Sequence, residues 1–245
     1  MADRNSVVTT HTTTVRHYEE QVVPGMRLGW HYEADTRDFD PTALMAAAGL
    51  NVVTDKRETV WDRYCPPFNQ GDVGSCVGNA VAGVLMTKGF WVPGRAFDEQ
   101  TAVTFYKMAT KLDSLPGSYP PDDTGTTGTA GAKAAKQTKY IHAYSHTNNF
   151  NHLLTTLNYQ SCMVGVGWYD SFDQPVNGVC PITPGAYVRG GHEFELVGQN
   201  PFDKMVYAVN SWGTTWGNGG YMAFSFNDME RLLGEGGQVT IFQAP

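Results

Sequence analysis

The sequence changes character near residue 162, and this change restricts the folds that the chain can adopt. Before that point, apolar residues recur at helical spacing, as one buried helix face requires. The clearest such set is Val77, Ala80, Val81, Val84 and Leu85. After it, short apolar or alternating runs lie between glycine, proline, asparagine and aspartate, which is typical of a mostly antiparallel sheet. Helices followed by strands predict an α+β fold of two packed lobes, with a site in the cleft between them.

The patterns place the individual elements. Helices are predicted to begin at Cys76 and after the capping residue Asp98, and to span residues 128–138 and 149–158. A shorter helix is expected at 40–49, in the run DPTALMAAAG. The predicted strands are 162–169, 192–199, 204–212, 220–226 and 238–244, with a hairpin turn at Asn200–Lys204.

The chain divides into three expected segments. Residues 1–23 are rich in threonine and valine and form an N-terminal arm, either disordered alone or added as a strand to the sheet edge of a protein partner. Residues 24–60 form an irregular extension that wraps the domain, and residues 61–245 form the domain itself. Its helical lobe is expected at about 70–140 and its β lobe at about 141–245.

Charge and composition narrow the possible partners. The 245 residues carry a formal charge of -7 with scattered basic residues, which argues against nucleic acid or an anionic membrane surface as partner. The first residues lack the order of a secretory signal, and no apolar run has the length of a membrane span. A cytoplasmic protein is therefore expected. Its four cysteines are too few and too irregularly spaced for a disulfide scaffold or a CxxC metal site.

The stretch PFNQGDVGSCVGNAVAGVLM places Cys76 between a glycine-broken loop and an apolar helix. A cysteine there is by default a small buried residue, but a helix N-terminus also lowers the pKa of a thiol and favours the reactive thiolate. Hydrolysis further needs a proton carrier, a group that orients the carrier, and donors for an oxyanion. His192, expected to be accessible at a strand start, and Asn210, at the end of the neighbouring strand, meet the first two needs if these strands form a hairpin.

Three motifs resemble those of the papain family of cysteine peptidases, in the same chain order. NQGDVGSCVGNA resembles the nucleophile motif, GGHEFELVG the histidine strand, and VNSWGTTWGNGGYM the asparagine and tryptophan motif. The resemblance covers most of residues 61–226 and implies a papain-like, two-lobed fold, with the nucleophile helix in the helical lobe and the histidine and asparagine in the β lobe. LGWHYEADTRDFD resembles the short leader of bacterial and bacteriophage members, which lack a long helical propeptide.

The resemblance implies a catalytic role for each residue that matches these motifs. Cys76 is implied as the nucleophile, and His192 as its ion-pair partner and general acid and base. Asn210 would orient His192. Gln70, six residues before the cysteine, would form an oxyanion hole with the backbone N–H of Cys76.

Substrate contacts are implied at four further positions. Trp212 would shield the catalytic hydrogen bond from water, and the glycine loop with Gly125 and Thr126 falls where the family has a wall of its substrate cleft. Glu193 replaces a residue that is usually small and apolar beside a specificity pocket. If it faces the cleft, it would favour a basic substrate side chain; if it faces solvent, it would select nothing.

The expected function is that of a cysteine peptidase, a thiol protease that hydrolyses peptide or isopeptide bonds through an acyl-enzyme without a cofactor. No metal site is expected, because no further ligands lie at suitable spacing from His142 and His146. These two histidines are expected to lie on a solvated face. One alternative is a non-catalytic papain-like scaffold or binding component, associated with the virion if the chain is encoded by a bacteriophage. Another is a thiol acyltransferase or cell-wall peptide endopeptidase that uses the same pair of residues.

Overall fold

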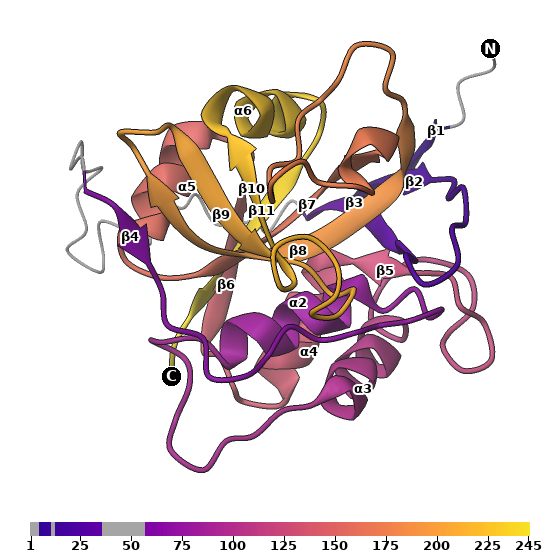
Figure 1. Cartoon of the computed structure of the whole chain (residues 1–245). Coiled ribbons are helices and arrows are strands. Elements are labelled where there is room, and N and C mark those ends of the chain that lie inside the picture. Colours follow the sequence, from indigo (N-terminus) through magenta and orange to yellow (C-terminus); the bar gives the residue numbers. More distant parts are fainter. Residues whose placement is uncertain (1–4, 11–12, 36–56) are drawn as a thin grey trace.

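The computed structural model describes three stretches of the chain, residues 5–10, 13–35 and 57–245. The helix expected at 40–49 lies outside these described residues. In Figure 1 three helices lie together on one side of a large sheet, and two further helices lie on its other side. The first three are α2 (Cys76–Leu85), α3 (Glu99–Ala109) and α4 (Gly128–Gln137), and the other two are α5 (Phe150–Leu157) and α6 (Phe226–Gly234).

The first three helices begin where the sequence predicts them. Helix α2 begins at Cys76, and every one of its residues is buried. It is therefore a central helix of the helical lobe. Asp98 caps α3, because its side chain accepts a hydrogen bond of 2.9 Å from the backbone N–H of Thr101. The side chain of Thr127 caps α4 in the same way. These caps satisfy N–H groups that the first helical turn cannot pair internally.

The β lobe is a seven-stranded sheet in which every pairing is antiparallel. Strands β8 (Val188–Asn200) and β9 (Met205–Val209) form the expected hairpin, in which Asn200 pairs with Met205. The spatial order of the main path is β10 (Tyr221–Ser225), β9, β8, β7 (Cys162–Tyr169), β11 (Gln238–Gln243) and β6 (Ala143–Thr147), and β4 (Thr59–Val60) pairs with β8. Helices α5 and α6 cover this sheet, which completes the predicted α+β fold.

A second, smaller sheet is built from the N-terminal part of the chain. Its order is β1 (Asn5–Thr10), β2 (Thr13–Tyr18), β3 (Trp30–Asp35) and β5 (Thr126–Thr127). The arm thus forms strands, as its composition predicts, but it pairs with the chain's own β3. Strand β3 in turn runs parallel to β5, at the start of helix α4. This pairing brings the N-terminal extension against the helical lobe (Figure 1).

Several elements differ from the sequence prediction. Strand β3, strand β6 and helix α6 were not expected. The expectation of a solvated face at His142 and His146 is wrong for His146, which is buried in β6 with its ring nitrogens near Thr129 and Thr240. His146 is buried because β6 pairs with β11. The sequence of β6 is short and polar and does not predict this pairing. No helix among the described residues is long and apolar enough to cross a membrane.

A buried ion pair joins the start of the domain to the sheet. The Nε of Arg63 lies 2.9 Å from a carboxyl oxygen of Glu195 on β8, and both side chains are almost fully buried. The hydroxyl of Thr87, just after α2, donates a hydrogen bond of 2.5 Å to the other oxygen. Burial raises the pKa of Glu195, whereas Arg63 and Thr87 lower it. The pair therefore fixes the helical lobe, the β lobe and the chain before the candidate nucleophile to one another.

Removing the cation alone is expected to destabilise the fold strongly. The substitution Arg63→Met leaves the Glu195 carboxylate buried without its ion-pair partner, which typically costs about 3–5 kcal/mol. The free energy of unfolding, measured by urea denaturation at pH 7, should fall by that amount. The double variant Arg63→Met with Glu195→Leu should recover most of the loss, since it removes both charges. A single variant as stable as the wild type would show that the pair contributes nothing.

Candidate active site

Cys76 is the first residue of helix α2, immediately after the loop that contains Gln70. The hydroxyl of Ser75 accepts a hydrogen bond from the side chain of Asn79 but none from the backbone of the first turn, so the side chain of Ser75 leaves the N–H groups at the helix start unpaired. The backbone N–H groups of Val77 and of Glu193 both lower the pKa of the Cys76 thiol. Because Glu193 lies on β8, its N–H places the sulfur directly against the β lobe.

His192 and Asn210 meet at the end of the β8–β9 hairpin. The Nε2 of His192 donates a hydrogen bond of 2.7 Å to the Oδ1 of Asn210, which also accepts one from the backbone N–H of Ser211. An oxygen that accepts from a backbone N–H fixes the orientation of the amide, and therefore the proton of neutral His192 sits on Nε2. The Nδ1 of His192 has no hydrogen-bond partner among the described residues, so it makes none with the Cys76 thiol in this state.

Two tryptophans enclose the imidazole. The ring of Trp212 lies 5.1 Å from that of His192 at 33°, and the ring of Trp168 approaches edge-on at 4.7 Å and 76°. Both indoles are buried, and they exclude water from the hydrogen bond between His192 and Asn210. A hydrogen bond in such a dry environment is electrostatically stronger than one in water.

Gln70 is held beside Cys76 by contacts with both lobes. Its Nε2 donates to the backbone oxygen of Val73 at 2.8 Å, and its Oε1 accepts from the hydroxyl of Ser211 at 2.5 Å. The backbone N–H of Gln70 also donates to the backbone oxygen of Ser211. The other N–H of the amide group has no acceptor among the residues that the structure describes, and the side chain is almost fully buried, so this donor is fixed in position.

The N-terminal extension runs through the space between the lobes and covers the site. The N–H of Gly29 donates to the backbone oxygen of Gly191 at 3.0 Å, and the oxygen of Gly29 accepts from the N–H of Thr126 at 2.8 Å. The indole N–H of Trp212 donates to the backbone oxygen of Arg27 at 3.1 Å. We call residues 18–31 the covering segment.

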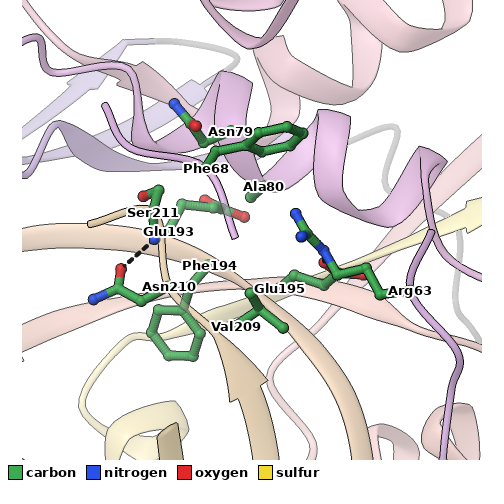
Figure 2. Close-up of a pocket in the computed structure, with 10 residues that line it drawn as sticks. All are labelled: Arg63, Phe68, Asn79, Ala80, Glu193, Phe194, Glu195, Val209, Asn210 and Ser211. Atoms are coloured by element: carbon green, nitrogen blue, oxygen red, sulfur yellow. Dashed lines mark hydrogen bonds and ion pairs between the residues drawn. The ribbon is translucent and has the colours of Figure 1, made fainter. Parts of the chain in front are cut away.

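The covering segment separates the site from solvent. The side chains of Leu28 and Trp30 are 0% exposed, and so are those of Cys76 and His192. A cavity of about 10 Å³ lies nearby between α2 and β8, scarcely the volume of one water molecule, and Glu193 and Asn210 are among the residues that line it (Figure 2). The expected cleft is therefore present but occupied by the chain itself.

Burial reverses two electrostatic expectations for Cys76 and His192. Loss of solvent raises the pKa of the Cys76 thiol above its ordinary range, and it outweighs the helix N-terminus, which acts in the opposite direction. Loss of solvent also lowers the pKa of His192 to about 3, although the hydrogen bond with Asn210 raises it. The expectations of an accessible imidazole and of a thiol with a lowered pKa are thus wrong for this covered state. Both groups are neutral in it.

The remaining candidate residues lie around the covering segment. Gly125 and Thr126 border it directly, and the Thr126 side chain donates a hydrogen bond of 2.5 Å to Asp113. Glu193 is fully buried and faces the covering segment, not the solvent. Among the described residues, no group of three or more histidine, cysteine, aspartate or glutamate side chains could hold a metal ion.

A thiol at a helix N-terminus and an imidazole oriented by an amide are groups that a hydrolase with a cysteine nucleophile requires. Residues 75–235 match the family model described as papain family cysteine protease. The chain belongs to this family and is a cysteine peptidase with a papain-like, two-lobed α+β fold. No curated protein sequence matches the chain significantly.

Solved structures of cysteine proteases share this fold. Xylellain, a cysteine protease from Xylella fastidiosa, is similar with a TM-score of 0.67 and 17% identity, over 93% of this chain and 99% of that chain. The Carica candamarcensis cysteine protease CMS1MS2 has a TM-score of 0.54 and 16% identity, over 76% and 98%. The bromelain protease from Ananas comosus has a TM-score of 0.53 and 15% identity, over 75% and 95%.

The structure also shows site residues that the sequence reasoning missed. Trp30 fills space beside Glu193, Trp168 packs on the imidazole, and Ser211 holds Gln70. Trp168 lies two positions beyond Val166, which pairs directly with His192, so the strand register alone could have placed it near the imidazole. Nothing in the irregular run around Trp30 indicates that it enters the cleft.

The covering segment is expected to protect Cys76 from alkylation, and a side chain at Gly165 should remove that protection. A Cβ at Gly165 would collide with the ring of Trp30, so Gly165→Val should displace the covering segment. Iodoacetamide labelling of Cys76, followed by mass spectrometry at pH 8, should become at least about tenfold faster.

The other three cysteines serve as internal controls for that experiment. Cys65 is partly exposed and should label at the same rate in both proteins. Cys162 and Cys180 are buried, so their labelling would report unfolding of the variant. Unchanged labelling of Cys76 in Gly165→Val would contradict the proposed cover.

Docking of the covering segment is expected to weaken in acid because of His31. The Nδ1 of His31 accepts from the N–H of Tyr18 at 3.1 Å, and its Nε2 lies 2.9 Å from the backbone oxygen of Thr124. Burial lowers the pKa of His31 from 6.5 to about 4. A displaced segment therefore binds a proton first. The contribution of His31 to docking is fully present above pH 6.5 and is lost progressively as pH falls towards 4.

Hydrogen-exchange protection factors of the Gly29 and Thr126 amides measure this effect. The ratio of the wild-type to the His31→Gln protection factors should fall about tenfold or more between pH 7 and pH 4.5. The buried Glu193 acts in the opposite direction, since its raised pKa makes docking weaker as pH rises, but it is present in both proteins and cancels in this ratio. Equal profiles for the two proteins would exclude His31 as the cause.

Proposed function

We propose that Cys76 is the nucleophile of the peptidase and that His192 is its general base and acid. The observation that carries this proposal is the hydrogen bond from His192 Nε2 to Asn210, which leaves the lone pair of Nδ1 free to accept the thiol proton. The thiolate then attacks the carbonyl carbon of the substrate. Imidazolium returns the proton to the leaving amine as the C–N bond breaks, which gives a thioester and a free amine.

The second half of the cycle uses the same groups. His192 takes a proton from water, the resulting hydroxide attacks the thioester, and the acid product leaves as the Cys76 sulfur regains its proton. Both tetrahedral intermediates carry an oxyanion, for which the uncommitted N–H of Gln70 and the backbone N–H of Cys76 are the proposed donors. The hydrogen bonds of Gln70 with Val73 and Ser211 support this role, because they fix the donor before the substrate arrives.

The active pair requires that the covering segment leaves. While it is docked, both groups are neutral, because a buried ion pair is costly without solvent. Water that enters the vacated cleft favours the charged forms, and the helix N-terminus then lowers the thiol pKa without opposition. The ion pair of Cys76 and His192 is thus proposed for the open state only.

The path of the covering segment also supports a mode of substrate binding. A substrate in extended conformation would replace it and use the backbone groups of Gly191 and Thr126 that now bind Gly29. Gly125 would leave room for the substrate backbone, and Trp212 would border the site while shielding His192. Glu193 would contact a substrate side chain.

Two broader features complete the proposal. The four cysteines are free, which supports a reducing, cytoplasmic location, with the virion as the corresponding place if a bacteriophage encodes the chain. Strand β1 is at the edge of its sheet and pairs with β2 only, among the described residues. An open edge can accept a strand from a protein partner.

One observation favours a non-catalytic scaffold as the second candidate, namely the complete burial of Cys76. It is the weaker candidate, because a scaffold does not need a hydrogen bond that orients His192 or a fixed amide at Gln70. The two candidates differ in the reactivity of Cys76 once the cleft is open.

Substitutions at the proposed catalytic residues should abolish or reduce peptide hydrolysis. Cys76→Ala should remove activity on fluorogenic peptides, whereas Gln70→Ala should lower kcat by about 10²–10³ because one oxyanion donor is lost. The control Cys65→Ala changes a thiol outside the site and should keep full activity. Hydrolysis by Cys76→Ala, or its absence in both the wild type and the Trp30→Met protein, in which docking of the covering segment is weakened, would refute the assignment.

A further inference from the structure

Glu193 is a buried carboxyl group that has neither a hydrogen-bond donor nor an ion-pair partner in the part of the chain that the structure describes. Its side chain is 0% exposed, and neither carboxyl oxygen has a hydrogen-bond partner among the described residues. Loss of solvent raises its pKa well above the ordinary value. The indole of Trp30 acts in the opposite direction, although its Nε1 makes no hydrogen bond of ordinary geometry. A buried polar group of this kind is rare in a native fold and calls for an explanation.

The neighbouring carboxyl on the same strand shows what compensation looks like here. Figure 2 shows Glu193 and Glu195 on the side of β8 that faces α2, with Phe194 on the other side. Glu195 is paired with Arg63 and bonded by Thr87. Glu193 is equally buried but has no such cation. Stability of the covered state therefore does not account for the charge at this position, since a leucine would cost less.

The side chain that now occupies the space beside Glu193 is Trp30. Gly165 pairs with Glu193 across β7 and β8, and a Cβ at Gly165 would collide with the indole. On the helical side, a Cβ at Gly128 would lie 3.0 Å from a carboxyl oxygen of Glu193. The missing side chain at Gly165 thus leaves the space that the indole fills, and the one at Gly128 leaves room for the carboxyl group of Glu193 beside it.

The occupant is part of an extended peptide. Trp30 follows Gly29, whose N–H and oxygen bind Gly191 and Thr126 through backbone groups only. Such bonds carry no side-chain information. The conformation seen at Gly29 suits glycine, since its φ is +145° and a Cβ would collide with the backbone oxygen of Gly74. The side chain in the neighbouring pocket then decides between one chain and another. The covering segment places an indole there, which fills the volume and leaves the carboxyl unpaired.

We infer that Glu193 determines substrate specificity, and that the pocket now filled by Trp30 accepts a lysine or arginine side chain of the substrate. This inference rests on the proposed function for its catalytic consequence. A lysine or arginine side chain has an apolar stem that replaces part of the indole and a cation that pairs with the carboxylate. Such a substrate supplies the compensation that Trp30 lacks, and it competes best against the covering segment.

The pocket can be tested in the full chain without any turnover. Trp30→Lys and Trp30→Met have side chains of similar length, and only the first carries a charge. Protection factors of the Gly29 and Thr126 amides at pH 7 should be about tenfold higher or more for Trp30→Lys, because a hydrogen-bonded ion pair adds to docking. In the Glu193→Gln background this difference should vanish. Equal protection in the two Trp30 variants with Glu193 present would overturn the inference.

A second measurement tests the catalytic consequence. The Trp30→Met protein, in which docking is weakened, is assayed on matched peptides that carry lysine, arginine, glutamine or leucine at each position near the cleaved bond. At one position the basic peptides should have a kcat/KM about tenfold higher or more. Glu193→Gln should abolish that preference, and Asp62→Asn, which removes an exposed charge elsewhere, should keep it.

The two measurements separate the possible failures. Cleavage without a basic preference, or a preference that Glu193→Gln leaves intact, would overturn the inference while the proposed function stands. No cleavage of any peptide would refute the proposed function, and the protection factors would still decide whether the pocket favours a cation.

Discussion

The backbone of Gly29 joins the two lobes of this peptidase. Its N–H binds the β lobe at Gly191 and its oxygen binds the helical lobe at Thr126, so one residue spans the cleft. The collisions that a Cβ would make at Gly165 and Gly191 show how closely the covering segment approaches the sheet. The burial of Cys76, the neutral state of His192 and the position of Trp30 all depend on this docking.

The same docking explains why the site holds a thiol and an imidazole in an environment that keeps both of them neutral. The residues that orient one another, His192 with Asn210 and Gln70 with Ser211, keep their hydrogen bonds in the covered state. Only the protonation of the pair depends on solvent, because burial disfavours both charged forms. The site is therefore assembled before it is exposed, and solvent entry is the remaining step.

Much of the architecture could be predicted because local signals and tertiary structure agree. The apolar stripe of α2, the cap at Asp98 and the turn between β8 and β9 each specify one local structure. The relation of His192 to Asn210 followed from the hairpin. The covering segment could not be predicted, because its place depends on pairing with β5 and with Gly191, which are far away in the chain, and not on its own pattern. The pKa directions failed for the same reason, since they depend on what covers the thiol.

The cover and the catalytic residues belong to one polypeptide, and this has a kinetic consequence. A tethered segment acts at an effective concentration that is typically in the millimolar range and does not change when the protein is diluted. Peptides in solution must therefore outcompete a neighbour that never diffuses away. A weakly bound or scarce peptide would not displace the covering segment at any enzyme concentration, whereas an abundant or tightly bound peptide would displace it.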